Sequence, residues 1–118
     1  MAGPSSPFEF IQRVWGTYTD PGLPGRVDRV SRQNLNASGY DPFGYSPDYV
    51  RGVLPSLAVI YRHYFRVVTH HIERVPTAGR ALLVANHSGQ LPVDGAMIGA
   101  SLLLDMEPPR MMRAMVER

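Results

Sequence analysis

A short apolar run followed by a polar loop constrains this chain more than any other stretch. Residues 81–85 read Ala-Leu-Leu-Val-Ala, carry no charge and follow an Ala-Gly turn signal, so they predict a β-strand buried on both faces. The loop after them holds His87 and Asp94, and from Gly95 the chain is apolar on nearly every side, which predicts a buried helix. A strand, a loop and a helix in this order place His87 at the carboxyl end of a strand, where open α/β sheets bind ligands.

The rest of the second half predicts two more strands and one more helix. Ser46 caps a helix that extends to residue 65 and is kinked or restarted at Pro55, and His63 on that helix is expected to face solvent. Residues 66–73, rich in β-branched side chains, and residues 110–116 predict strands. Strand, helix and strand in order form a parallel βαβ unit. We therefore predict an α/β domain over residues 46–118, with helices and a partial, mostly parallel sheet.

The first 45 residues predict a flexible amino-terminal arm with a short amphipathic helix. Residues 1–5 are expected to be disordered, and Ser6 caps a helix with Pro7 at its first position. Residues 20–44 carry turn chemistry and predict a connector, with one or two helical turns over residues 27–33. The helix carries little positive charge, which favours packing on protein over a membrane surface. Its apolar stripe comprises Phe8, Ile11, Trp15 and Tyr18.

His87 and Asp94 are the two ionisable groups of the polar loop. Histidine can take and return a proton near neutral pH, and a carboxylate on its second nitrogen fixes the tautomer and stabilises the imidazolium. The two residues are too far apart for contact in an extended chain, but Gly89 and Pro92 can turn the loop back. Spacing alone leaves the contact open. The alternative is that Asp94 only caps the next helix and His87 is an ordinary loop residue.

At these residues the chain resembles glycerolipid acyltransferases. Residues 86–95, Asn-His-Ser-Gly-Gln-Leu-Pro-Val-Asp-Gly, resemble the first motif of the 1-acylglycerol-3-phosphate acyltransferase family, in the form of a subgroup often labelled glycerol acyltransferase. That family usually has four residues between its His and Asp, and we interpret the longer gap here as a variant. The lead-in over residues 72–76, Ile-Glu-Arg-Val-Pro, is also similar. The resemblance covers about residues 42–118.

The resemblance implies an O-acyltransferase of phospholipid biosynthesis, with an amino-terminal acyltransferase-type fold. It would move a fatty acyl group from acyl-CoA or acyl carrier protein, as co-substrate, to a hydroxyl of a glycerolipid. His87 would be the general base and Asp94 would orient it. Ser88 and Gly89 would bind substrate, with a turn role as the alternative for Ser88. The implied partners are the acyl thioester donor, the glycerolipid acceptor and a membrane in peripheral contact, with no metal and no further cofactor.

Composition bounds the class of protein. The 118 residues suffice for one small domain, and 44% hydrophobic with 19% charged residues is typical of a globular protein. A net charge of +2 gives no case for nucleic-acid binding, and the absence of Cys excludes thiol catalysis and Cys-based zinc sites. His70 and His71 would point to opposite faces of a strand, not to one metal. No signal peptide or membrane span is visible, so we expect a cytoplasmic protein, peripheral at most to the inner face of the membrane.

The acyltransferase family carries further motifs, among them a Pro-Glu-Gly-x-Arg-like element that holds the acceptor. No Glu-Gly pair occurs in this chain. We therefore interpret it as the amino-terminal part of a longer enzyme, inactive as a fragment alone. The alternative is a non-catalytic truncated remnant or interaction module of the same fold. A hydrolase that uses Ser88 is disfavoured, because the side chains of adjacent residues diverge and no Gly-x-Ser-x-Gly elbow surrounds Ser88.

Overall fold

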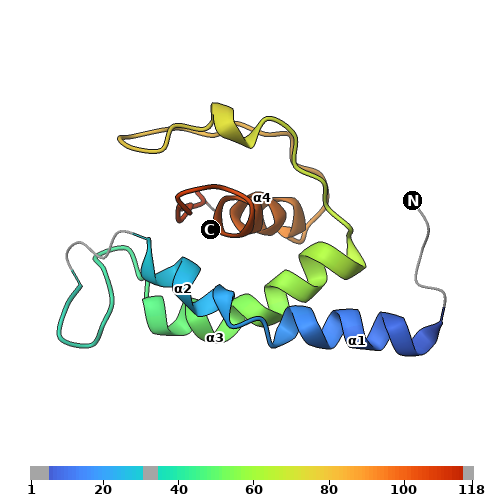
Figure 1. Cartoon of the computed structure of the whole chain (residues 1–118). Coiled ribbons are helices and arrows are strands. Elements are labelled where there is room, and N and C mark those ends of the chain that lie inside the picture. The colour runs from blue at the N-terminus through green and yellow to red at the C-terminus, as the bar shows by residue number, and fades with distance from the viewer. Residues whose placement is uncertain (1–5, 31–34, 116–118) are drawn as a thin grey trace.

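The computed structural model describes residues 6–30 and 35–115, and within these ranges the regular structure is helical (Figure 1). The expected disorder of residues 1–5 lies outside the described residues. The longer helices are α1 (Pro7–Tyr18), α3 (Pro47–Val59) and α4 (Val93–Leu104). The shorter elements are the α-helix α2 (Gly22–Asp28), the π-helix η1 (Ile60–Tyr64), which continues α3, and the 3₁₀ helix η2 (Ile72–Arg74).

Two helices begin where the sequence predicts. The Ser6 hydroxyl accepts a hydrogen bond from the backbone N–H of Glu9 at 3.2 Å, and the Ser46 hydroxyl accepts one from Tyr49 at 3.5 Å. Each cap is followed by proline at the first helical position, where the missing N–H costs nothing. α3 then runs through Pro55 without restarting. The capping residues alone therefore locate these two starts.

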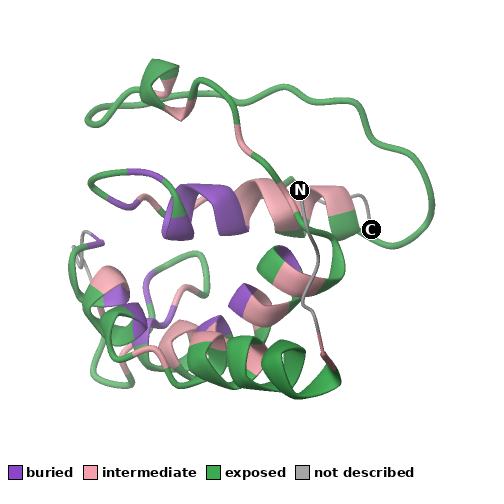
Figure 2. Ribbon diagram, turned by 45° about the vertical axis from the view of Figure 1, so that its right-hand side comes forward, coloured by how far each residue is buried: buried purple, intermediate pink, exposed green. Residues whose placement is uncertain are grey.

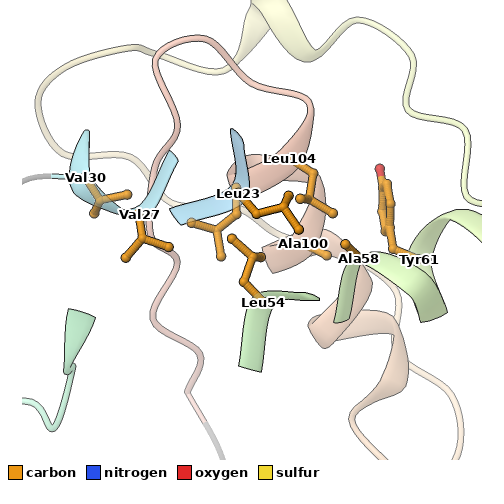
Figure 3. Close-up of a cluster of buried hydrophobic side chains, with 9 residues drawn as sticks. Leu23, Val27, Val30, Leu54, Ala58, Tyr61, Ala100 and Leu104 are labelled. Carbon is orange, nitrogen blue, oxygen red and sulfur yellow. The ribbon is translucent and has the colours of Figure 1, made fainter. Parts of the chain in front are cut away.

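The core lies where α2, α3 and α4 meet (Figure 3). Each helix contributes one apolar face at helical spacing, and burial of these faces supplies the main driving force for folding. α2 lies within the predicted connector and begins before residues 27–33, for which one or two helical turns were expected. Residues 31–33 lie outside the described ranges. The buried members are Leu23, Val27, Val30, Leu54, Ala58, Tyr61, Ala100, Leu103 and Leu104.

Tyr61 places the polar end of its ring within this packing. Its side chain is 1% exposed, and its hydroxyl contacts the Thr69 hydroxyl at 2.6 Å and donates to the Asp105 carboxylate at 2.5 Å. Burial, with the hydrogen bond to Asp105, raises the pKa of Tyr61 to about 12. The phenol therefore stays protonated and joins η1, the segment after it and the residue that follows α4.

Arg26 closes the carboxyl end of α4. Its guanidinium donates to the backbone carbonyls of Leu103 and Met106 at 2.5 and 2.6 Å and pairs with the Glu107 carboxylate. The last carbonyls of a helix lack partners inside the helix, so a cation there satisfies them and complements the helix dipole. Arg29 also pairs with Glu107, at 2.7 Å, and the two arginines hold the pKa of Glu107 below its usual range.

The predicted α/β fold is wrong, because the described residues contain no strand and no sheet. The segments predicted as strands are irregular or extended, and no backbone hydrogen bonds join them; residues 116–118 are not described. Residues 66–71 and 80–92 overlap in the view of Figure 1, but Figure 2 shows them apart, so they do not pair as strands. Instead of being buried on both faces, residues 81–85 are exposed, with Leu82 at 78% and Val84 at 87%.

Two local features explain why a sheet does not form. Arg66 and His71 have positive φ angles of 51° and 58°, so the backbone turns near both ends of the run predicted as a strand. A strand also needs a neighbour for its N–H and C=O groups and, in a parallel sheet, helices over both faces. The buried face of α4 is instead used against α2 and α3. The β-branched composition of residues 66–73 indicates neither the positive φ angles nor the lack of a neighbouring strand.

α1 is confirmed as a helix, but its contacts differ from the prediction. Thr17 bonds His63 through its hydroxyl, at 2.7 Å to Nε2, and the Phe10 ring meets the His63 ring edge-on at 6.2 Å. His63 is thus half-buried between η1 and α1 and does not face solvent as predicted. The apolar stripe of α1 lies on another side and is exposed, with Trp15 and Tyr18 stacked on each other. In the described ranges, no helix has the length and apolarity to cross a bilayer.

Truncation of Leu54 tests the packing of α3. We expect Leu54→Ala to lower the free energy of unfolding by about 2–5 kcal/mol, because the side chain is 1% exposed and its removal leaves a cavity. The neighbouring Val53→Ala is the control: Val53 is 41% exposed, so its change should stay within about 0.5 kcal/mol. Urea unfolding followed by circular dichroism measures both. Equal losses in the two variants would contradict the described core.

Candidate active site

The loop between residues 85 and 93 turns back on itself before α4. Gly89 has a φ of +93°, a conformation that side-chain-bearing residues rarely adopt, so the turn itself requires glycine here. A further tight turn follows, in which the N–H of Val93 donates to the carbonyl of Leu91 at 2.8 Å. α4 begins at once, and Asp94 lies in its first turn. The loop therefore ends with a carboxylate at the positive end of a helix dipole.

This turn brings His87 and Asp94 into contact. The Nδ1 atom of His87 lies 2.8 Å from Oδ1 of Asp94. Oδ2 of the same carboxylate accepts the backbone N–H of Ser88 at 3.3 Å, and Oδ1 also accepts the N–H of Gly95 at 3.3 Å. The contact that spacing left open is thus formed. Asp94 occupies the first helical turn and orients the histidine at the same time.

The hydrogen bond from His87 is the largest cause of a lowered pKa at Asp94; burial opposes it, and the Ser88 amide adds to the lowering. An ionised carboxylate only accepts hydrogen bonds, so Nδ1 of His87 must carry the proton of the pair. In the neutral ring Nε2 then carries the lone pair, on the other side from Asp94, and Nε2 forms no hydrogen bond to any described residue. With its side chain 55% exposed, His87 offers an accessible, oriented base.

The structure shows backbone roles for Ser88 and Gly89, and their binding of substrate stays a prediction. Ser88 contributes its backbone amide to the Asp94 carboxylate, while its hydroxyl bonds no described residue. Gly89 supplies the turn. Sequence reasoning missed the amides of Ser88 and Gly95 as donors; the signal was a short loop running into a helix whose first turn holds an acid. The described ranges hold no cluster of three or more His, Asp and Glu side chains suited to a metal ion.

A second histidine–carboxylate pair gives a comparison within the chain. His71 Nδ1 lies 3.3 Å from Oε1 of Glu73, and both side chains are more than half exposed. No backbone amide is recorded on the Glu73 carboxylate, in contrast to the two on Asp94. The His87 pair is therefore shorter and better anchored than a chance surface pair of the same chemistry.

Comparison with known proteins finds relatives without an assigned activity. The chain is 36% identical over 111 residues to an uncharacterized protein of Mycobacterium leprae, an alignment that covers 87% of this chain and 30% of that protein. It is 37% identical over 73 residues to uncharacterized proteins of Mycobacterium bovis and Mycobacterium tuberculosis, covering 60% of this chain and 20% of each. The chain thus spans less than a third of their length. No family model matches the sequence, and no solved structure matches it.

Carbon NMR titration of the Asp94 carboxyl group tests the pair. We expect it to titrate below the usual range for aspartate and to move up in His87→Ala, because the hydrogen bond from His87 is the largest cause of the shift. The lowered pKa means that the carboxylate stabilises the fold at neutral pH and loses this effect as pH falls through that pKa. His71→Ala is the control and should leave Asp94 unchanged. An Asp94 titration that is the same with and without His87 would contradict the contact.

Proposed function

We propose that this chain carries the catalytic His–Asp pair of an acyltransferase that moves a fatty acyl group from an acyl thioester to a hydroxyl of a glycerolipid. The observation that carries the proposal is the 2.8 Å contact between His87 Nδ1 and Asp94 Oδ1, with Nε2 directed away from the carboxylate. The sequence around it resembles the acyltransferase motif. The donor is acyl-CoA or acyl carrier protein, and no metal or further cofactor takes part.

The proposed reaction uses the two ring nitrogens of His87 for different tasks. Nε2 of His87 takes the proton of the acceptor hydroxyl as its oxygen attacks the thioester carbonyl, and the carboxylate of Asp94 stabilises the imidazolium that forms. A C–O bond forms and the C–S bond breaks. The proton then passes from His87 to the departing thiolate, which restores the neutral base. No covalent enzyme intermediate is needed, because the acceptor oxygen itself is the nucleophile.

Transition-state stabilisation needs more than this pair. The tetrahedral intermediate carries an oxyanion that requires positioned donors, and their removal typically costs ~10²–10³-fold in rate. The N–H groups of Ser88 and Gly95 already bind the Asp94 carboxylate, so they are committed elsewhere. Part of the site must therefore come from outside the loop.

One observation favours a second candidate, a non-catalytic interaction module. Leu82 and Val84 are exposed beside the loop, and such apolar side chains favour contact with another surface. A thiol-release assay with acyl-CoA separates the candidates. Release that requires an acceptor lipid supports the transferase, and a folded protein with no release supports the module.

Substitution of the pair tests the acyltransferase. In the native gene product, we expect His87→Ala to reduce acyl transfer by ~10²–10⁴-fold, because it removes the general base. Asp94→Asn should also reduce turnover, because the amide cannot balance the imidazolium. His71→Ala, which removes the other exposed histidine–carboxylate pair, should leave the rate unchanged. Transfer that persists in His87→Ala at the rate of the unsubstituted protein would overturn the proposal.

A peripheral membrane contact through α1 fits an enzyme whose acceptor is a lipid. The stripe of Phe8, Ile11, Trp15 and Tyr18 is exposed along one side of α1, while Phe10 and Thr17 hold the helix to η1. Tryptophan and tyrosine favour the boundary between lipid headgroups and acyl chains, where the ring is buried and its polar atom stays wet. α1 carries one acid, Glu9, and one base, Arg13, so its net charge is zero and apolar burial supplies the attraction.

Co-sedimentation with phosphatidylcholine vesicles tests this contact. We expect Trp15→Ser to weaken binding by roughly tenfold or more, because burial of a large apolar ring is lost. Tyr49→Ser is the matched control, since Tyr49 is equally exposed but lies on α3. Equal partitioning of the two variants and the unsubstituted protein would exclude α1 as the contact.

A further inference from the structure

A polar hollow lies between α1 and η1, apart from the His87 loop. Its volume is about 510 Å³, and the residues around it are contributed by the second half of α1, the residues after it, and η1. Two of them are arginines, one from each side of the hollow. The lining residues are Arg13, Gly16, Thr17, Asp20, Arg62 and His63.

Arg13 and Arg62 bring two positive charges to the hollow, and Asp20 is the acid among its lining residues. In the described ranges neither Arg13 nor Arg62 forms an ion pair, whereas Arg26, Arg29, Arg51 and Arg113 each do. The acid of the hollow is Asp20, and its Oδ1 accepts the backbone N–H of Gly22 at 2.8 Å. Two arginines and one aspartate leave the lining with a formal charge of +1, which favours an anion in the hollow.

His63 and Gly16 also line the hollow. The His63 ring is fixed by the Thr17 hydroxyl at 2.7 Å and by the edge of Phe10, so it holds one orientation beside the arginines. Burial lowers the pKa of His63, and the charges of Arg13 and Arg62, which line the same hollow, lower it further. Gly16 has nothing within 4 Å of the position where a Cβ would stand, so this side of the hollow is open.

We infer that the hollow binds a phosphate group, held by Arg13 and Arg62 beside the Thr17–His63 pair. Guanidinium groups present paired N–H donors that match the spacing of phosphate oxygens. A phosphate group also offers three acceptor oxygens to the two guanidinium groups, whereas a carboxylate offers two. The inference does not depend on the proposed activity of His87, because it rests on other residues at another place in the fold.

NMR titration of the whole chain with inorganic phosphate tests the site. We expect chemical-shift changes at the His63 ring and the Thr17 amide, and weak saturable binding. Arg13→Gln and Arg62→Gln should each weaken binding by roughly tenfold, as expected for loss of one charge-assisted pair. Both side chains are exposed, so the fold should persist. Arg74→Gln, an exposed arginine outside the hollow, is the matched control and should bind as the unsubstituted chain does.

A vesicle arm distinguishes a lipid phosphate from a soluble one. If binding to vesicles that contain phosphatidic acid, but not to phosphatidylcholine alone, weakens in Arg13→Gln and Arg62→Gln, the phosphate belongs to a lipid headgroup. If only inorganic phosphate binding weakens, the ligand is a soluble phosphate ester. Both results support the site. Phosphate shifts that spread over the surface, or equal binding in Arg13→Gln, Arg62→Gln and Arg74→Gln, would overturn it.

Discussion

The buried face of α3 is the contact on which the rest of the structure depends. Leu54, Ala58 and Tyr61 follow one another at intervals of three or four residues, so α2 and α4 both pack on one stripe. The same stripe ends in the Tyr61 hydroxyl, which ties the end of α4 through Asp105. Because α4 is fixed at its carboxyl end, by this bond and by Arg26, its amino end projects with Asp94 toward the loop.

The candidate pair is formed by the amino end of α4 and the loop before it. α4 supplies Asp94 and the Gly95 amide, and the loop supplies His87, the Ser88 amide and the turn at Gly89. Every one of these contacts spans eight residues or fewer, so the pair forms from local geometry. Contacts between residues close in sequence do not require the sheet that we predicted. The His87–Asp94 contact therefore forms although the predicted fold class is wrong.

The sequence predicted what depends on neighbours along the chain and failed where distant partners decide. The caps at Ser6 and Ser46, the extent of α1 and the helix after the polar loop follow from local chemistry. Residues 81–85 have the composition of a buried strand, yet burial requires a partner strand, which composition does not supply. We predicted that His63 faces solvent because no residue near it in the sequence indicates its contact with α1. Its partner Thr17 lies 46 positions earlier in the chain. The Ser88 amide was missed because backbone donors leave no mark in a sequence.

The exposure of the loop bears directly on its chemistry. A general base needs orientation, and the 2.8 Å contact with Asp94 provides it. Acyl transfer also needs water kept from the thioester, since water competes with the acceptor hydroxyl for the same carbonyl. His87 is more than half exposed, and Leu82 and Val84 beside it present apolar surface to solvent. For the proposed acyl transfer, covering the loop is therefore a physical condition for transfer to outcompete hydrolysis.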